Sequence, residues 1–378
     1  MDSIEIDNKE VIIMNLVHYF ITEKNYNPVV VHGITDEIWL ENMQSDYKII
    51  RIVSKYIHNN EQMGFDKFRA KQIIKKLRLK TLTWKMNVFN IYVDLGENVT
   101  NLEDDKNDFS VFVCKMSDIN NPTLIKVFPD IMEKTKHDEE GIQLLFKITE
   151  DINVNNEAKN KKMEKIFSSK KPLVTYLLMT ICIVMFIISG GGLVNNILFN
   201  LGFNNGIAVR SGQVYRLISS MFLHMGLAHI FFNMYSLYYV GIKIEDFFGK
   251  WKYLLIFLLS GVCGNLLSIG FHPESYSVGA SGAIFGLFGA LIYFGYTYRG
   301  YIGSIIRSQI LPIVIFNLFI GFMIPGIDVA AHVGGLIGGI ITAKMFGTIE
   351  NKEYGLMDII LFVLYFGFLI AFGFGLIG

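Results

Sequence analysis

Charged residues are scarce in the second part of this chain, although the whole sequence carries as many cations as anions. Its 378 residues include 34 Lys and Arg and 34 Asp and Glu, so the formal net charge is zero and gives no argument for binding nucleic acid. Up to about Lys171, apolar and charged residues alternate as in a globular domain. Beyond Pro172, charges nearly disappear and long apolar runs follow. The sequence therefore predicts two parts of different character.

Cysteine is also rare, and a signal peptide is not recognisable. Cys114, Cys182 and Cys263 form no CxxC pair, which excludes a zinc knuckle or a disulfide framework and favours small buried apolar side chains. The N-terminus, MDSIEIDNKE, is acidic and has no apolar core, so no cleavable signal is expected there. We expect the first membrane span to provide targeting instead.

Apolar runs that approach the thickness of a bilayer fill the chain after Pro172. A helix needs about 20 apolar residues to cross the hydrocarbon core, where its backbone must be hydrogen-bonded internally. The runs that reach or approach this length are 172–190, 227–243, 253–271, 281–298, 308–325, 329–346 and 358–378. They predict a polytopic α-helical membrane protein, preceded by a small soluble α/β domain.

Basic residues flank these runs mainly on one side, which predicts the orientation. They precede the first run and lie between runs two and three, four and five, and six and seven: Lys161, Lys162, Lys165, Lys170, Lys171, Lys243, Lys250, Lys252, Arg299, Arg307, Lys344 and Lys352. On the other side the long first loop carries only Arg210 and Arg216. We expect a cytoplasmic N-terminus and an extracytoplasmic C-terminus in the cell membrane.

Two histidines lie inside these runs, where ionisable side chains are costly and usually functional. His229 and His332 begin the second and sixth runs, and Ser281 begins the fourth. Even-numbered runs all start at the external face, so the three side chains are expected at one depth near that face. Asn233 follows His229 by one helical turn and shares its face.

Glycines repeat at intervals of four in runs four and six, a pattern that lets membrane helices approach closely. The repeats are Gly282, Gly286 and Ala290, with Gly334 and Gly338, and Gly335 and Gly339. If these stripes face each other, Ser281 and His332 come within hydrogen-bonding distance. The plainer interpretation, that the glycines only pack helices and the histidine bridges them, remains open.

A serine beside an imidazole is a pattern typical of nucleophilic catalysis. The hydroxyl is a weak nucleophile until a base removes its proton, and a general base contributes roughly 10²–10⁴-fold. Ser281 is expected at a helix N-terminus, where free backbone N–H groups favour a developing oxyanion. His229 and Asn233 can add side-chain donors.

The motif strings around these residues resemble those of rhomboid intramembrane proteases. The string GASG at 279–282 resembles the GxSG signature, and AHVGG at 331–335 resembles the AHxxG stretch. The spacing of His224, His229 and Asn233 matches the HxxxxHxxxN pattern. Tyr215-Arg216, where the family often has Trp-Arg, and Glu245 fit further positions, and the resemblance covers about 172–378.

The resemblance implies a serine endopeptidase with a Ser–His dyad and with neither a cofactor nor a metal ion. Carried over by position, Ser281 is the nucleophile and His332 the base, and the oxyanion hole consists of His229, Asn233 and Ser281. Gly279 and Phe285 support the site, with Phe285 standing where tyrosine often packs under the imidazole. His224 and Arg216 are expected to tie down the first loop.

The resemblance also implies a division of the chain. A six-helix core spans 172–357, and 358–378 is an added seventh span. Substrates are single-span membrane proteins that enter from the lipid beside span five, and the active site lies near the extracytoplasmic face.

Asp328 offers a third acid, since it lies one turn before His332. Asp before an apolar run is, however, a favoured helix N-cap. We interpret it as the start of span six.

The segment 1–150 reads as a cytoplasmic α/β domain with a regulatory or partner-recruiting role, followed by a polar linker at 151–171. Val11–Thr22 and 65–80 show helical patterns, and 29–34, 47–53 and 108–115 look like strands. Helix 65–80 is basic and suits either anionic lipid or solvent. The acidic strings 137–140 and 103–105 suggest either a divalent-cation site or solvated surface.

Other functions are disfavoured. A zinc intramembrane protease needs a string such as HExxH, which is absent. An aspartyl one needs two carboxylates inside the spans, and these are absent too. The remaining alternative is a catalytically inactive rhomboid-like scaffold that binds membrane clients, although such proteins usually lose Ser or His.

Overall fold

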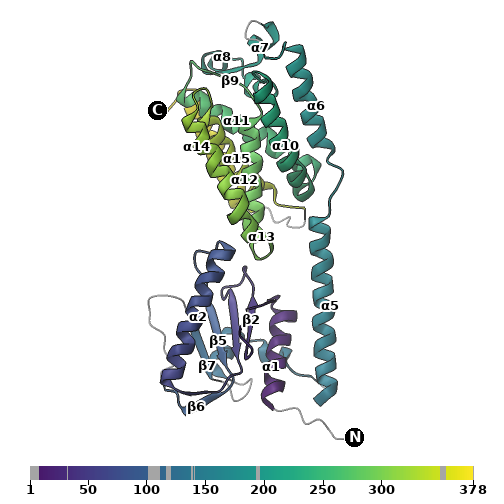
Figure 1. Ribbon diagram of the computed structural model, residues 1–378, viewed down its shortest axis with the longest axis vertical. Coiled ribbons are helices and arrows are strands. Elements are labelled where there is room, and N and C mark those ends of the chain that lie inside the picture. The colour runs from purple at the N-terminus through teal and green to yellow at the C-terminus, as the bar shows by residue number, and fades with distance from the viewer. Residues whose placement is uncertain are drawn as a thin grey trace. The chain divides into compact units, whose positions relative to one another are not determined.

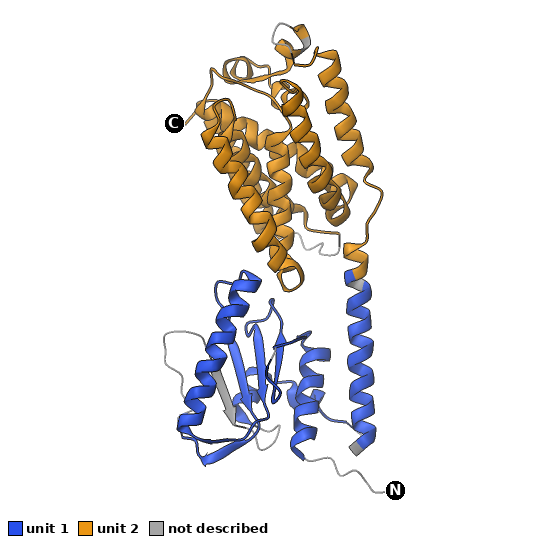
Figure 2. Ribbon diagram, viewed as in Figure 1, with its two compact units in different colours: residues 1–163 blue, residues 164–378 orange. Residues whose placement is uncertain are grey.

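The computed structural model describes residues 8–31, 33–100, 111–115, 121–137, 139, 141–192, 196–349 and 355–377. The chain forms two compact units, Met1–Met163 and Glu164–Gly378 (Figure 2). We describe each unit by itself.

The N-terminal unit is built on a mixed five-stranded sheet in the order β1-β2-β3-β5-β7 (Figure 1). The strands are β1 (Asn27–Val29), β2 (Glu37–Glu41), β3 (Ile49–Val53), β5 (Val88–Tyr92) and β7 (Val111–Lys115). The pairs β1–β2 and β2–β3 are antiparallel, whereas β3–β5 and β5–β7 are parallel. Two short parallel strands, β4 (Ile57–Asn59) and β6 (Leu95–Asn98), form a separate pair.

Both faces of the sheet are covered, and the central strands β3 and β5 are buried on both sides. On one face Ile50 and Ile52 join a cluster with Leu16 and Phe20. The helices that belong to this side are α1 (Asn8–His18), the π-helix Tyr19–Glu23, α3 (Pro122–Val127), α4 (Ile131–Lys134) and α5 (Gly141–Phe167). On the other face Ile49 packs with Ile74 of α2 (Asn60–Thr81).

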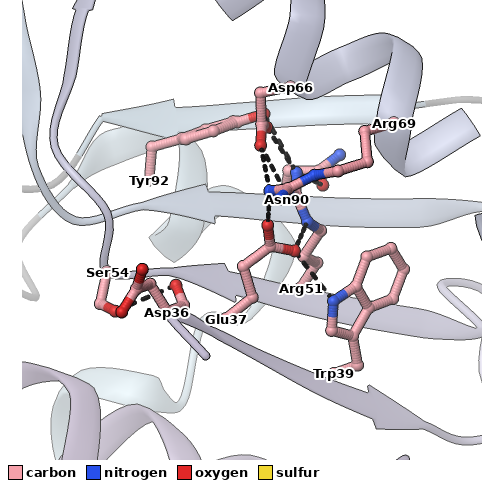
Figure 3. A network of polar contacts seen from close by, with 9 residues as sticks. All are labelled: Asp36, Glu37, Trp39, Arg51, Ser54, Asp66, Arg69, Asn90 and Tyr92. Atoms are coloured by element: carbon pink, nitrogen blue, oxygen red, sulfur yellow. Dashed lines mark hydrogen bonds and ion pairs between the residues drawn. The ribbon is translucent and has the colours of Figure 1, made fainter. Parts of the chain in front are cut away.

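A charged network lies within this second face (Figure 3). The guanidinium of Arg51, which is fully buried, donates to both carboxylate oxygens of Asp66 at 2.7 and 2.8 Å and to Glu37 at 2.7 Å. The hydroxyl of Tyr92 donates to Asp66 at 2.7 Å. The partly exposed side chain of Arg69 forms an ion pair with the buried carboxylate of Glu37. Burial of a charge is tolerated here because it is paired and hydrogen-bonded.

The structure corrects two expectations for this part. The strand predicted at 29–34 ends at Val29, and β2 and β5 were not predicted. The segment predicted as a linker, 151–171, is helical through Phe167, and residues up to Met163 belong to the N-terminal unit. Helix α5 continues because Ile152 still packs on the core and Asn155 Nδ2 donates to the backbone carbonyl of Ile21.

The proposed cation strings gain no support from the structure. Asp138, Glu140 and the segment 103–105 lie outside the described residues. Within the described residues no group of three His, Cys, Asp or Glu side chains is arranged to hold a metal ion.

The C-terminal unit is helical, and each predicted apolar run coincides with a helix. These are α6 (Leu173–Ile188), α10 (Leu227–Phe248), α11 (Lys250–Phe271), α12 (Ser281–Thr297), α14 (Leu311–Met323), α15 (Val329–Phe346) and α16 (Leu356–Gly373). The fifth run begins earlier than predicted, since α13 (Arg299–Ile305) and the π-helix Ile306–Ile310 lead without a break into α14.

Short elements connect α6 to α10. They are α7 (Ile197–Gly202), α8 (Gly206–Arg210), α9 (Arg216–Ser219) and the 3₁₀ turn Ser220–Phe222, and β8 (Asn204–Asn205) pairs with β9 (Tyr276–Ser277) before α12.

The length and composition of its helices make this a multi-pass membrane protein, although not every apolar helix is long enough to cross a bilayer. Four helices of the described chain can cross a bilayer: Lys250–Phe271, Arg299–Met323, Val329–Phe346 and Leu356–Gly373. Helix α10 adds a fifth only if it is joined to the bent segment before it. Leu173–Ile188 and Ser281–Thr297 are apolar but shorter. The predicted total of seven spans therefore stays a prediction.

The glycine stripes of α12 and α15 do face each other. A Cβ on Gly335 would lie 1.9 Å from the carbonyl oxygen of Gly282, and one on Gly339 would lie 1.9 Å from that of Gly286. The second stripe of α15 faces α11 instead, with Gly338 against Cys263. Backbone contact on both sides of α15 leaves room only for glycine.

Candidate active site

Ser281 is the first residue of α12, and a glycine with a positive φ lies two residues before it. Gly279 has φ +117°, a conformation that side chains rarely adopt. Its N–H donates to the carbonyl oxygen of Ser220 at 2.9 Å, which fastens the turn before α12 to the loop before α10. Ser281 is thus presented at a helix N-terminus whose free N–H groups favour negative charge.

His332, in the first turn of α15, reaches Ser281 across the glycine contact. Its Nε2 lies 2.9 Å from the hydroxyl oxygen of Ser281. The imidazole is buried and lies parallel to the ring of Phe285, with centroids 4.3 Å apart and planes at 14°. The ring contact expected of Phe285 is therefore present.

The other nitrogen of His332 does not meet an acid. Its Nδ1 is buried and has no hydrogen-bond partner within the described part of the chain. The carboxylate of Asp328 accepts from the backbone N–H of Ala331 at 2.9 Å and from the hydroxyl of Ser268 at 2.5 Å. Asp328 is the N-cap of α15, as predicted, and both of its oxygens are already used.

His229, in the first turn of α10, presents a ring nitrogen to the turn before Ser281. A Cβ added to Gly279 would lie 2.7 Å from its Nε2. Its Nδ1 accepts the backbone N–H of Met225 at 3.3 Å. Because Nδ1 must hold a lone pair for this contact, a neutral His229 carries its proton on Nε2. This N–H is then available beside Gly279.

Asn233 is less directly engaged. Its side-chain nitrogen donates to the carbonyl oxygen of His229 at 2.9 Å, one turn back along α10. One amide N–H remains for another acceptor, and the amide oxygen is buried without a partner among the residues described. The carbonyl contact fixes which end of the amide carries the nitrogen.

Hydrogen bonds from side chains fix the long loop between α6 and α10. Arg216 was expected from the sequence to do this, whereas Asn265 was not. Arg216 donates to the carbonyl oxygens of Asn200 and Phe203 at 3.0 and 2.9 Å. Asn265 of α11 donates to the carbonyl oxygen of Leu217 at 2.8 Å and to the hydroxyl of Ser220 at 2.9 Å. Nothing in the sequence distinguished Asn265 or Ser220, because their partners are distant along the chain.

Glu245, near the end of α10, has a structural position. It is buried, and its carboxylate accepts the backbone N–H groups of Val174 and Thr175 at 3.0 and 2.8 Å and the Thr175 hydroxyl at 2.8 Å. It therefore satisfies free donors at the start of α6.

Comparison with known proteins relates this chain to a family. The Rhomboid domain family model matches residues 211–349. The rhomboid protease GluP of Bacillus subtilis is 30% identical over 359 residues, which cover 90% of this chain and 71% of GluP. This chain belongs to the rhomboid family.

Plant rhomboids match a smaller share of this chain. RHOMBOID-like protein 2 of Arabidopsis thaliana is 40% identical over 151 residues, 39% of this chain and 46% of the plant protein. RHOMBOID-like protein 7 is 38% identical over 142 residues, 36% of this chain and 44% of its own length. GluP is similar along most of this rhomboid, its N-terminal unit included, whereas these plant relatives share less than half of their own length with it.

Proposed function

We propose that this rhomboid is an intramembrane serine endopeptidase in which Ser281 and His332 form the catalytic dyad. The observation that carries the proposal is the 2.9 Å contact between Ser281 Oγ and His332 Nε2, from two helices that touch through glycine. A nucleophile and its base within hydrogen-bond distance are the signature of covalent catalysis.

In the proposed reaction, His332 Nε2 removes the hydroxyl proton while Ser281 Oγ attacks the carbonyl carbon of a peptide bond. The tetrahedral oxyanion is stabilised by the backbone N–H of Ser281, the Nε2–H of His229 and the remaining amide N–H of Asn233. The protonated His332 then gives its proton to the leaving amine, and the peptide bond breaks to leave an acyl ester on Ser281. Water attacks this ester with His332 again as base, which releases the acid and restores the hydroxyl.

A two-residue mechanism is supported by the surroundings of His332. Asp328 is occupied by Ala331 and Ser268 rather than by the imidazole. The stacked ring of Phe285 limits rotation of the imidazole. Gly279 supports the site because its missing side chain lets the ring of His229 approach the turn before Ser281.

We propose that substrates are single-span membrane proteins that enter from the lipid beside α14. Several large apolar side chains of this helix are exposed, with Ile315, Phe319 and Phe322 at 64, 60 and 74%. A loosely packed helix is the one most easily displaced by an incoming segment.

The proposed orientation in the cell membrane places the N-terminal unit in the cytoplasm and the active site and the C-terminus on the extracytoplasmic side. It is supported by the bias of lysine and arginine among the loops. Reporter fusions after Lys171 and after Gly378 test it: the first is expected to be active only as a cytoplasmic reporter and the second only as an exported one.

Labelling with a fluorophosphonate serine-hydrolase probe tests the dyad. The purified wild type in detergent is expected to label, whereas Ser281→Ala and His332→Ala are not. Ser268→Ala is a matched control, since this serine contacts Asp328 rather than His332. A folded wild type that fails to label in detergent and in lipid would favour a scaffold that binds membrane clients without cleaving them.

A further inference from the structure

Trp84 is held outward from the N-terminal unit, in the turn that follows α2. Its side chain is 92% exposed, more than any other large apolar side chain of the described residues. Its neighbours Thr83 and Met86 are buried. The two buried side chains anchor this turn, while the indole between them in the sequence lies in solvent.

The turn that presents Trp84 is fastened by several hydrogen bonds. The backbone N–H groups of Leu82 and Thr83 both donate to the carbonyl oxygen of Arg78. The Arg78 guanidinium donates to the carbonyl oxygen of Trp84 at 2.5 Å. The hydroxyls of Thr81 and Thr83 lie 2.9 Å apart in a buried contact. Exposure of the indole is therefore a fixed feature of the fold.

Basic residues precede and follow this tryptophan along the chain. Helix α2 carries seven basic and two acidic residues, a net charge of +5 (7 − 2), and one of the acids, Asp66, is paired with Arg51. Lys75, Lys76 and Lys80, in the last turns of α2, and Lys85 after it are all exposed. One carboxylate at this end, Glu41, interacts electrostatically with Lys80. We name Trp84, Lys75, Lys76, Lys80 and Lys85 the Trp84 surface.

The Trp84 surface lies at the end of the unit from which the chain leaves for the first apolar helix. Near the end of α5, Lys159 Nζ donates to the backbone carbonyl of Tyr26 at 3.3 Å and to the side chain of Asn27 at 3.2 Å. The hydroxyl of Tyr26 donates to the carbonyl oxygen of Tyr47, in the turn between β2 and β3. Lys159 is thereby fixed beside this turn.

The same turn adjoins Trp84 on its other side. The backbone N–H of Ile49 donates to the carbonyl oxygen of Asn87 at 3.2 Å, and the hydroxyl of Thr83 contacts the sulfur of Met43 at 3.7 Å. The blue unit in Figure 2 has one end of α2 and the departing end of α5 on the same side.

The connection from this end to the membrane is short and basic. From Met163, where the N-terminal unit ends, to Leu173, where α6 begins, a fully extended chain spans at most about 35 Å. Lys165, Lys170 and Lys171 lie within it. The N-terminal unit is therefore tethered to the membrane helices by a short segment, which raises the effective concentration of lipid that this unit meets.

We propose that the Trp84 surface docks on anionic phospholipid headgroups of the leaflet at which α6 begins. Tryptophan prefers the membrane interface, where its ring meets the acyl boundary and its N–H meets water. Clustered lysines are attracted to anionic lipid within a Debye length. Docking holds the N-terminal unit against the membrane, and it does not depend on the chemistry of Ser281.

Fluorescence of the full chain in nanodiscs tests the proposal. Phosphatidylcholine alone is compared with phosphatidylcholine mixed with phosphatidylglycerol, each with and without brominated acyl chains as quenchers. Subtracting the emission of Trp84→Phe isolates Trp84, because Trp39 and Trp251 are common to both proteins. We expect the Trp84 emission to be blue-shifted and quenched in the anionic nanodiscs only, and to recover at high salt.

Charge reversal provides the control. The pair Lys80→Glu and Lys85→Glu is expected to abolish quenching, whereas Lys55→Glu, exposed beyond the opposite end of β3, is not. Unquenched Trp84 in anionic nanodiscs would overturn the proposal, and so would quenching that is equal in both lipids or unchanged by the paired reversal. Both lipid compositions are the same in the two leaflets, so the test is independent of orientation, and it uses no probe of Ser281.

Discussion

At the scale of single residues, the candidate site depends on an absent side chain as much as on those present. Gly279 has a positive φ and leaves His229 room beside the turn before Ser281. Two separate requirements, backbone conformation and space, meet at this glycine. A control glycine that has a positive φ but open space around it distinguishes the effect of backbone conformation from the effect of crowding.

Gly279→Ala is expected to slow fluorophosphonate labelling of Ser281 by about 10²-fold, the usual effect of losing one oxyanion donor. The new Cβ would lie 2.7 Å from Nε2 of His229 and push the ring away. Gly212→Ala is the matched control, since Gly212 has a similar φ of +104° and open space around it. Equal labelling rates for the two variants would contradict the role assigned to Gly279.

Arg51 and Asp66 provide a second residue-scale prediction, in the N-terminal unit. Burial alone would raise the pKa of the Asp66 carboxyl, but the hydrogen bonds and charge of Arg51, together with the Tyr92 hydrogen bond and the charge of Arg69, lower this pKa below its usual value. A carboxyl with a lowered pKa stabilises the fold above its unfolded-state pKa, and this contribution is lost as pH falls through the folded-state pKa.

Asp66→Asn is therefore expected to destabilise the N-terminal unit at pH 7 by about 3–5 kcal/mol, because it removes one of the two carboxylates that pair with the buried Arg51. The difference from wild type should shrink as the solution is acidified. Amide hydrogen exchange of β3 and β5 in the full chain measures both effects. Asp94→Asn, which removes a half-exposed partner of Lys9, should cost less than about 1 kcal/mol. A similar loss in both variants would refute the argument from burial.

At the scale of elements, the contact between α12 and α15 determines whether the dyad forms. Ser281 and His332 belong to different helices, and their 2.9 Å contact requires the backbones to touch at Gly282 and Gly335. Each added methyl group at this seam must separate the helices, because neither backbone can move aside.

Gly335→Ala is expected to lower the unfolding temperature in detergent and to abolish probe labelling, with overpacking costing at least 1–3 kcal/mol, typical of a filled core. Gly367→Ala in α16 is the control, because nothing lies within 4 Å of the added Cβ. In a helix interior the control should be neutral or slightly stabilising. Normal labelling by a folded Gly335→Ala protein would show that the seam tolerates separation.

At the scale of the whole molecule, the two units are expected to have separable roles. The site residues all belong to the unit Glu164–Gly378, and the N-terminal unit has its own core. We expect the first unit to regulate the protease or to recruit partners.

Deletion of residues 1–163 should therefore leave Ser281 labelling close to the wild-type rate while changing which membrane substrates are cleaved. The cut falls at Met163 rather than at residue 150, because α5 packs on the N-terminal core beyond that point. Labelling and cleavage of a panel of single-span proteins are measured in the same vesicles. A folded deletion that no longer labels would contradict separate roles.

The sequence by itself determined the helices of the membrane part and the residues of the candidate site. Long apolar runs have one solution in a bilayer, so their positions follow from composition. Ser281, His229 and His332 stood out because polar groups in such runs are conspicuous. Asp328 was recognised as an N-cap because capping depends on residues within one turn. Family resemblance then assigned the roles.

Only the tertiary structure decided which groups meet. Contacts between separate segments determine which glycine stripe of α15 faces α12 and which tautomer His229 adopts. They also place Asn265 where it donates to the first loop. The N-terminal unit was predicted less well. Its strands β2 and β5 were not predicted, and Arg51 carries a charge into a buried strand, which local patterns do not foresee. Its pairing with Asp66 and Glu37 exists only once the strands and α2 have come together.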